Sequence, residues 1–317
     1  MLSTPVLFII FNQPETTQVV FDAIRKVQPE QLFVAADGPR LYKKGEHEKC
    51  EATRAIIKQV DWNCEVKTLF HKENLGCDKA LFGAFDWFFK NVEEGIVLES
   101  DCLPHPDFWN YAAELLERYR YEETIKSIGG NNFQQGIQRG DGSYYYSAFL
   151  HIWGWATWRR AWEDYDYNVA KKTTVKEAFA ICKWLYKKEE AQKYWMTLFK
   201  YIREGRPNMW DYRIAFSNWK KQGLSIVPNV NLVTNIGFHP DAISTKDLNS
   251  PFANLPLNPI LPLKHPSLIE RDITADNYYY DYYLDGTLNN SSIRRKVENI
   301  IPWKLRKKIS SIFRKQK

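Results

Sequence analysis

The chain has 317 residues, of which 44% are hydrophobic and 15% aromatic, and it carries a formal net charge of +6. This length allows one large domain or two small ones, and the composition excludes a disordered chain. The excess of Lys and Arg is concentrated in residues 293–317 while the rest is slightly acidic, which argues against a nucleic-acid-binding body.

Strand and helix patterns alternate along the first third of the chain. Short apolar runs predict strands at Val6–Phe11, Leu32–Ala36, Cys64–Phe70 and Ile96–Leu98. Helical patterns lie between them at Thr16–Val27, within Lys43–Lys58 and at Asp78–Asn91. This alternation is typical of a Rossmann-like α/β fold, in which helices flank a mostly parallel sheet.

The remaining chain is less regular. Helices are predicted at Phe108–Tyr121, over Val175–Arg203 and from Met209 to Trp219, and extended pieces at Ile125–Gly130, Tyr144–Phe149, Leu224–Val227 and Val230–Val233. We expect one catalytic domain at residues 1–250, with a donor half at about 1–105 and an acceptor half at about 106–250. A C-terminal extension, residues 251–317, is rich in Pro and Tyr and is expected to wrap the surface.

Two acidic residues follow the strand that ends at Leu98. Glu99 and Asp101 flank Ser100 where the carboxyl end of a parallel strand would bind a ligand. Carboxylates there are suitable ligands for Mg²⁺ or Mn²⁺, which bridge phosphate oxygens. The alternative is a strand tip with two solvated acids.

Further polar and aromatic residues stand near strand ends. Asp37 follows the second strand and can accept a hydrogen bond from a nucleobase, although Asp-Gly is also a common turn. Lys79 can reach a phosphate, or it can be a solvated helical lysine. Trp153, Trp155 and Trp158 can stack on the apolar faces of sugar rings, or they can belong to the core.

Together these residues resemble a GT-A nucleotide-sugar glycosyltransferase. The likeness is to the group that includes the N-acetylglucosaminyltransferase acting early in N-glycan processing, and to bacterial family 2-like polysaccharide glycosyltransferases. It runs from about Val6 to His239 and depends on four pieces in the right order. The resemblance implies a GT-A fold, Mn²⁺ or Mg²⁺, a nucleotide-sugar donor (a UDP-sugar favoured), a saccharide or glycolipid acceptor and transfer with inversion.

The resemblance also implies contacts with the donor. The turn after the first strand, Phe11, Asn12 and Gln13, would contact the nucleotide, and an ordinary turn is the alternative. Asp101 would bind the cation, and Glu99 would contact the ribose or a metal-bound water. Ser100 stands where similar enzymes commonly carry a further carboxylate, and this departure leaves the donor contacts at Ser100 open.

Two more roles follow from the resemblance. Trp210-Asp211-Tyr212 resembles a Trp-Asp-Asp-Trp-type segment, which makes Asp211 the general base that takes the acceptor proton. Asp211 could instead be a helix N-cap. His239, after the last extended piece, would be a second contact to the metal or diphosphate, or an ordinary surface histidine.

Two rival functions share some of these features. A nucleotidyltransferase that builds nucleotide sugars would have the same sheet and acidic strand tip, but it should carry a Gly-rich phosphate loop, and Asn12-Gln13-Pro14 contains no glycine. A non-catalytic carbohydrate-binding or haemolysin-like surface protein would explain the tryptophans. It would not explain Glu99, Asp101 and Asp211 together.

The C-terminal tail, residues 293–317, predicts a contact with membranes. Apolar residues recur there at helical spacing among Lys and Arg, a pattern typical of helices that lie on anionic membranes. The alternative is a helix packed on the protein. With no apolar run long enough to span a membrane and no signal-peptide pattern, we expect a cytoplasmic enzyme, held at the inner face of the cell membrane, that builds capsule, O-antigen or lipopolysaccharide.

Overall fold

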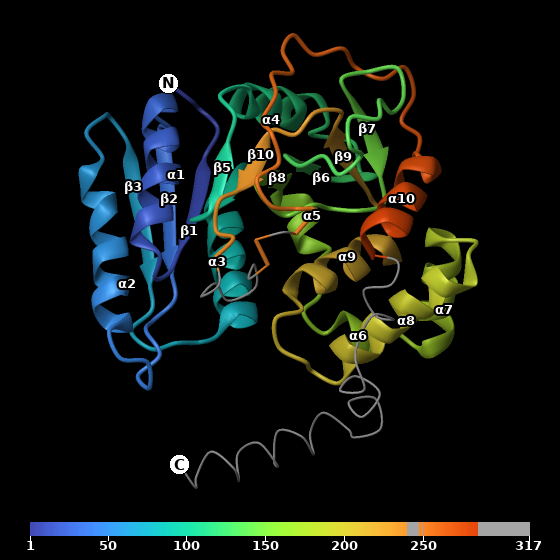
Figure 1. Ribbon diagram of the computed structural model, residues 1–317, viewed down its shortest axis with the longest axis horizontal. Helices are drawn as coiled ribbons and strands as arrows, with labels where there is room; N and C mark the ends of the chain where they lie inside the picture. Colours follow the sequence, from blue (N-terminus) through green and yellow to red (C-terminus); the bar gives the residue numbers. More distant parts are fainter. Residues whose placement is uncertain (240–246, 249, 285–317) are drawn as a thin grey trace, which may run out of the picture.

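The computed structural model describes residues 1–239, 247–248 and 250–284. Eight strands form one sheet in the order β3-β2-β1-β4-β8-β6-β9-β7 (Figure 1). The strands that run in a common direction are β1 (Val6–Ile10), β2 (Gln31–Ala36), β3 (Glu65–Phe70), β4 (Glu94–Glu99), β6 (Ile125–Gly129) and β9 (Leu224–Pro228). Antiparallel to them are β7 (Tyr144–Ser147) and β8 (Trp155–Trp158). The predicted α/β fold with a mostly parallel sheet is confirmed.

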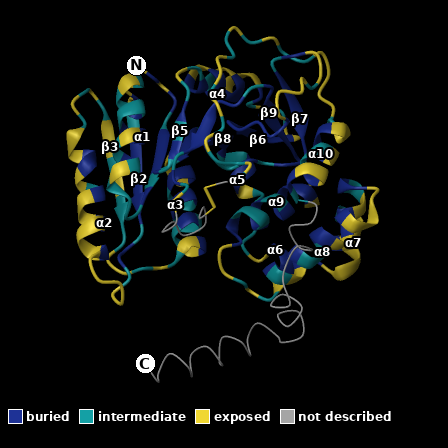
Figure 2. Ribbon diagram, viewed as in Figure 1, coloured by how far each residue is buried: buried dark blue, intermediate teal, exposed yellow. Residues whose placement is uncertain are grey.

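Side chains that alternate along the strands build a core on each face of the sheet. In β1, Val6 and Phe8 belong to one buried cluster and Leu7 to another. The first cluster is covered by α1 (Pro14–Val27) and α4 (Asp107–Arg118), and the second by α3 (Cys77–Asn91) and α9 (Trp210–Lys220). Figure 2 shows the inner strands β6, β8 and β9 as buried, whereas the edge strand β3 has no buried residue. The remaining helices of the first half are α2 (Glu46–Ala55) and η1 (Ile56–Gln59).

A third core lies among helices in the second half of the chain. Figure 1 shows α6 (Val169–Lys172), α7 (Val175–Leu185) and α8 (Glu189–Arg203) gathered beside α9. Buried side chains such as Cys182, Leu198 and Trp219 join them. The helical pattern predicted over 175–203 therefore forms two helices. They are separated at Tyr186, whose backbone is extended and whose hydroxyl donates to the Asp276 carbonyl 3.0 Å away.

Four short elements differ from the prediction. The tryptophan-rich block contains β8, a central strand, and α5 (Arg159–Glu163). A separate two-stranded ribbon pairs β5 (Cys102–Pro104) with β10 (Val233–Asn235). The strand predicted at Val230–Val233 therefore begins only at its last residue. Aromatic residues that are buried on both faces of the sheet produce no period-2 pattern, so β8 had no recognisable signal.

The described part of the predicted C-terminal extension packs on the body of the protein. The carboxylate of Asp107 accepts a hydrogen bond from the Ile260 amide at 2.9 Å. The chain then forms α10 (Ile273–Tyr279), whose N-cap is Asp272, and η2 (Tyr280–Leu284). The basic tail, residues 293–317, lies outside the described residues. Among the helices described, none is both long and apolar enough to cross a membrane.

Candidate active site

A polar cavity of about 610 Å³ opens where the strand order reverses. From β1 the chain moves outward to β2 and β3, and then returns to place β4 on the other side of β1. Such a switch point, at the carboxyl ends of parallel strands, is where open α/β sheets bind ligands. The residues that define this polar cavity are Ile9, Ile10, Phe11, Asn12, Gln13, Ala35, Ala36, Asp37, Arg40, Tyr42, His71, Asn74, Gly76, Cys77, Ala80, Leu81, Ala84, Glu99, Ser100, Asp101, Ile152, Trp153, Asn208, Trp210, Asp211 and Asn235.

The turn after β1 is held in the polar cavity by a partly buried ion pair. Asn12 donates from Nδ2 to Oε1 of Glu46 at 2.9 Å, and Arg40 donates from Nε to Oε2 of Glu46 at 2.8 Å. The guanidinium of Arg40 also lies over the ring of Phe11. Burial acts to raise the pKa of Glu46, but the hydrogen bonds from Arg40 and Asn12, together with the charge of Arg40, outweigh it and the pKa is lowered. The ion pair therefore orders Phe11 and Asn12. Sequence reasoning missed Arg40 and Glu46, since neither is part of a recognisable motif.

Asp37 lines the polar cavity, but its carboxylate organises a neighbouring loop. Oδ1 accepts the amides of Gly38 and Leu75 at 2.8 and 2.9 Å. Oδ2 accepts the Asn74 side-chain amide at 2.9 Å and the Gly76 amide at 3.1 Å. A carboxylate offers about four acceptor positions, so this loop uses all of them. We therefore interpret Asp37 as a positioning residue for the wall of the cavity; a direct contact to a base remains a sequence prediction.

The two acids of the strand tip lie half-buried in the polar cavity. Burial raises the pKa of Glu99, and the nearby carboxylates of Asp101 and Asp211 raise it further. Burial also raises the pKa of Asp101, against hydrogen bonds from Cys102 and Asn235. The ionised forms of both residues are therefore disfavoured until a cation is nearby.

The β5–β10 ribbon presses the backbone after β10 against Asp101. The Ile236 amide donates to the Asp101 carbonyl at 2.8 Å. A Cβ at Gly237 would lie only 2.3 Å from Oδ2 of Asp101, so a residue without a side chain is required there. Ser100, buried beside this contact, has its Oγ 3.4 Å from Oε1 of Gln13. The strand tip is thus fixed by elements that are distant in sequence.

These residues fit a divalent cation of the kind that also binds phosphate. Within the described residues no group of three or more His, Cys, Asp or Glu could hold a metal ion alone. Mg²⁺ is commonly held by one or two carboxylates together with substrate phosphates, however. Asp101 and Glu99, with their disfavoured ionised forms and their oxygen donors facing a cavity, match that type of site.

Asp211 is in the first turn of α9, but it is not the N-cap. The N-cap position is Met209, whose amide donates to Oδ1 of Asp78 at 3.0 Å, so a residue of α3 caps α9. Sequence reasoning gave Asp78 no role, because a cap from a distant helix leaves no local pattern. Burial raises the pKa of Asp211 to about 6, and hydrogen bonds from its own amide and that of Tyr212 act against this rise. Asp211 is thus half-buried and is not the N-cap residue of α9.

A second, aromatic cavity of about 210 Å³ adjoins the polar cavity. Ile152, Trp153 and Asp211 line both, so Asp211 stands at the junction. The residues that define the aromatic cavity are Asn131, Phe133, Phe149, Leu150, His151, Ile152, Trp153, Trp195, Asp211, Tyr212, Ala215, Trp219, Phe252, Tyr279 and Leu284.

The three predicted acceptor-side tryptophans have different places. Trp153 is half-buried and lines both cavities. Trp155 and Trp158 are buried in β8 and line neither cavity; the indole of Trp158 donates to the Leu116 carbonyl at 3.1 Å. Strand β8 directs both rings into the cores of the sheet. The prediction of acceptor binding is therefore carried forward for Trp153 alone.

Two predicted ligands lie outside both cavity walls. Lys79 is exposed on α3, and His239 is exposed two residues after Gly237. The contact between Gly237 and Asp101 brings the backbone near the acidic tip, but the His239 side chain does not line the polar cavity. Their contacts with phosphate and metal stay predictions from sequence.

Comparisons with known proteins place the chain only loosely. No family model and no curated protein matches it. Among similar solved structures is a mannosyltransferase from Pyrobaculum calidifontis in complex with GDP-Man and Mn²⁺, at 11% identity, 69% coverage of this chain, 70% of the other and a TM-score of 0.38. Another is TarS 1–349 from S. aureus, at 10% identity, 69% and 71% coverage and a TM-score of 0.34. A third is a cytidylyltransferase from Leptospira borgpetersenii, at 14% identity, 55% and 66% coverage and a TM-score of 0.33.

These similar structures include both glycosyltransferases and nucleotidyltransferases. None reaches the similarity at which a shared reaction would follow. The function must therefore be inferred from the two cavities and the residues between them.

Proposed function

We propose that the protein is a cation-dependent, inverting glycosyltransferase that moves a sugar from a nucleotide-sugar donor, with a UDP-sugar favoured, to a saccharide or glycolipid acceptor. One observation carries the proposal: Asp211 stands where a polar cavity at the sheet's switch point meets an aromatic cavity. The polar cavity suits a nucleoside diphosphate and the aromatic cavity suits a sugar ring. Two substrates bound in this way would meet at a carboxylate.

The proposed reaction is a direct displacement at the anomeric carbon. Asp211 accepts the proton of an acceptor hydroxyl while the hydroxyl oxygen forms a bond to that carbon. The bond from the anomeric carbon to the diphosphate oxygen breaks, and the nucleoside diphosphate leaves with the electron pair. A base works best when its pKa is close to the working pH, and burial brings the pKa of Asp211 to about 6.

In the polar cavity we assign the cation, Mn²⁺ or Mg²⁺, to Asp101, with Glu99 beside it. The resemblance implies His239 as a further ligand, and its side chain would have to reach the cation from outside the cavity wall. When bound there, the cation would neutralise the charge that develops on the departing diphosphate. Asp78, by capping α9, and Asp37, by ordering the loop before α3, are positioning residues.

A nucleotidyltransferase is the second candidate, since similar solved structures include that class. Such an enzyme must bind a nucleoside triphosphate. Arg40 is the single Lys or Arg among the described residues that line the polar cavity, and it is paired with Glu46. This low positive charge supports the glycosyltransferase.

Thermal unfolding with nucleotides would test the proposal. UDP or GDP should raise the melting temperature of the full chain in Mn²⁺ but not in EDTA, and a panel of nucleotide sugars should then reveal slow, Mn²⁺-dependent donor hydrolysis. Release of pyrophosphate from a nucleoside triphosphate and a sugar phosphate would instead identify the nucleotidyltransferase. If no nucleotide stabilises the protein, both the glycosyltransferase and the nucleotidyltransferase are rejected.

The place of this reaction in bacterial surface-polysaccharide synthesis, as capsule, O-antigen or lipopolysaccharide, is part of the proposal. It is supported by the basic tail, residues 293–317, which would hold a cytoplasmic enzyme at the inner face of the membrane. In sedimentation with anionic vesicles, the full chain should be found in the pellet, and a chain that ends at Asn290 should stay in the supernatant. Equal sedimentation of both chains would reject the membrane contact.

A further inference from the structure

The aromatic cavity contains a buried histidine whose ring nitrogens make no hydrogen bond to the described residues. His151 is only 7% exposed, and its ring packs edge-on against Phe133 and Tyr279, with centroids 4.5 and 4.8 Å apart. No hydrogen bond joins either nitrogen to the described part of the chain, and neither is among the fully buried polar atoms without a partner, so the nitrogens are accessible from the cavity. Buried polar groups are nearly always hydrogen-bonded. An imidazole in a cavity wall that makes no hydrogen bond to the described residues is therefore available to bond a ligand.

The aromatic cavity also has an unusual charge. Burial lowers the pKa of His151 to about 3, so the ring is neutral and offers one donor and one acceptor. Of the described residues that line this cavity, none is Lys or Arg, and Asp211 is its sole acidic residue. A cavity with one carboxylate and no cation selects against an anionic ligand by repulsion.

The size and walls of the aromatic cavity fit one sugar ring. An engineered cavity of about 150 Å³ in another protein holds benzene, so 210 Å³ accommodates a substituted six-membered ring. Phe133, Trp153 and Tyr279 offer ring faces and edges to the apolar C–H faces of a sugar. A six-membered ring with hydroxyls on its rim can contact these walls and still reach His151.

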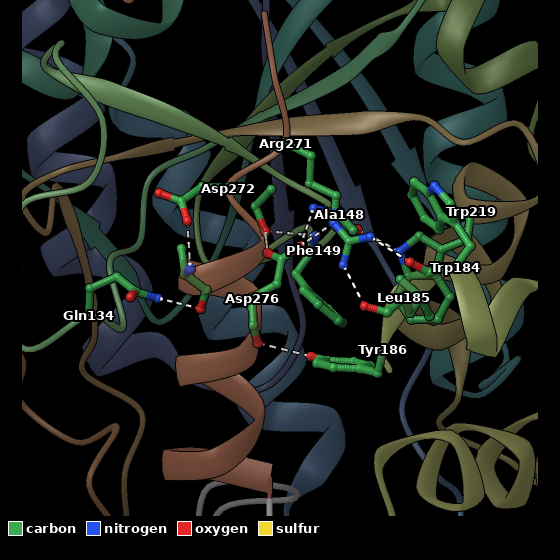
Figure 3. A network of polar contacts seen from close by, with 12 residues as sticks. Gln134, Ala148, Phe149, Trp184, Leu185, Tyr186, Trp219, Arg271, Asp272 and Asp276 are labelled. Carbon is green, nitrogen blue, oxygen red and sulfur yellow. Dashed lines mark hydrogen bonds and ion pairs between the residues drawn. The ribbon is translucent and has the colours of Figure 1, made fainter. Parts of the chain in front are cut away.

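One wall of the aromatic cavity is fixed by the network in Figure 3, which anchors α10. The buried carboxylate of Asp276 accepts hydrogen bonds from the Ser147 hydroxyl and the Ala148 amide. Arg271 donates to Asp276 and also to the Trp184 and Leu185 carbonyls, at 2.8 and 2.7 Å. Tyr279, three residues beyond Asp276, is therefore held in place before any ligand arrives, and the cavity is preformed.

We propose that the aromatic cavity binds an uncharged sugar ring of the acceptor, and that His151 selects this ring through a hydrogen bond to one of its hydroxyls. The inference deepens the proposed function and rests on it, since Asp211 at the mouth of the cavity would face the hydroxyl that attacks. Uronic acids and phosphorylated sugars are excluded from this position.

Ligand-observed saturation-transfer NMR on the full chain tests the inference. The probes are the methyl β-glycosides of glucose, galactose and N-acetylglucosamine, with methyl β-glucuronide as the anionic counterpart of glucose, each with and without UDP and Mn²⁺. We expect at least one neutral glycoside to bind, and the glucuronide to bind at least about tenfold more weakly than that one.

Two substitutions of His151 and one of a control histidine distinguish the hydrogen-bonding role of His151 from a general effect of losing a histidine. His151→Phe should weaken the neutral glycoside about tenfold or more, because the hydrogen bond is lost from a desolvated site, while His151→Gln should recover part of the affinity. His265→Phe is the matched control. His265 bonds to the Tyr144 hydroxyl at 2.9 Å and lines neither cavity, so glycoside binding should not change.

Three outcomes would overturn the inference: the glucuronide binds as well as the neutral glycosides, His151→Phe binds them unchanged, or UDP binds while no glycoside does. If His151→Phe does not fold, an unchanged affinity in His151→Gln, together with equal binding of the glucuronide, overturns it in the same way. Selective binding of neutral glycosides without any nucleotide binding would reject the proposed glycosyltransferase but leave the sugar site standing.

Discussion

The polar and aromatic cavities meet at Asp211 but are built in different ways. The polar cavity is formed by the ends of neighbouring strands and the turns that follow them, such as Phe11 after β1 and Glu99 at the end of β4. The aromatic cavity gathers Phe133, Trp195 and Tyr279 from a loop, α8 and α10. A site at a sheet's switch point follows from topology, whereas the aromatic cavity depends on long-range packing. The two cavities should therefore respond differently to substitution.

Asp211→Asn should have the largest effect, since Asp211 belongs to both cavities. Loss of a general base costs about 10²–10⁴-fold in rate, so transfer should fall by that factor. Nucleotide affinity and neutral-glycoside affinity should each stay within a few-fold. Single-turnover transfer and equilibrium binding measure the two quantities. Transfer close to the wild-type rate would remove Asp211 from the reaction.

Asp276→Asn should weaken the anchor of α10, which carries Tyr279 in the wall of the aromatic cavity. The change leaves the buried guanidinium of Arg271 without its charge partner, which should reduce the free energy of unfolding by about 3 kcal/mol. Denaturant unfolding measures this loss. Asp281→Asn is the matched control, because Asp281 pairs with Lys188 at the surface and such pairs contribute less than about 1 kcal/mol. Equal losses in both variants would show that the Asp276 network does not anchor α10.

Asp101→Asn should affect the polar cavity alone. Removing a carboxylate from the proposed cation site should weaken nucleotide binding in Mn²⁺ by about 10–100-fold, while binding in EDTA should not change. Neutral-glycoside binding in the absence of nucleotide should also be unaffected. Calorimetric titration of UDP with each cation measures the difference, and Asp22→Asn, which lines neither cavity, is the control. Unaltered affinity in Mn²⁺ would assign the cation elsewhere.

The smallest predicted effect is on stability, and it depends on pH. The pKa of Asp211 is raised to about 6 in the folded protein from an ordinary value of 3.8, so the folded state holds the proton more tightly than the unfolded state. Ionisation therefore destabilises the fold as pH rises between these values. Asp211→Asn should stabilise the protein by about 1–3 kcal/mol above pH 6, and by nothing below pH 3.8. A gain that is independent of pH would contradict a buried, ionising Asp211.

The sequence predicts the polar cavity much better than the aromatic one. The polar cavity is formed by strand ends, which have local patterns, whereas the aromatic cavity depends on long-range packing. Val6–Phe11 and Ile96–Leu98 are short apolar runs with polar residues at their ends, so both the sheet and the acidic tip can be read locally. Arg40 and Glu46 lie close together in the sequence. The hydrogen bond by which Asp78 caps α9, in contrast, joins residues 131 positions apart, and no local pattern predicts it. Trp155 and Trp158 have the same local appearance as Trp153. Only the placement of β8 separates buried rings from the ring that faces the cavity.

The central claim is that donor and acceptor occupy adjoining cavities at Asp211, and interligand nuclear Overhauser effects test it most directly. Asp211→Asn protein in Mn²⁺ would be given a nucleotide sugar together with the neutral methyl glycoside that binds best, so that both ligands are bound without turnover. We predict cross-peaks between the anomeric proton of the donor and ring protons of the glycoside, with each ligand retaining its affinity in the presence of the other. Competition between the two ligands, or joint binding without interligand cross-peaks, would contradict the account.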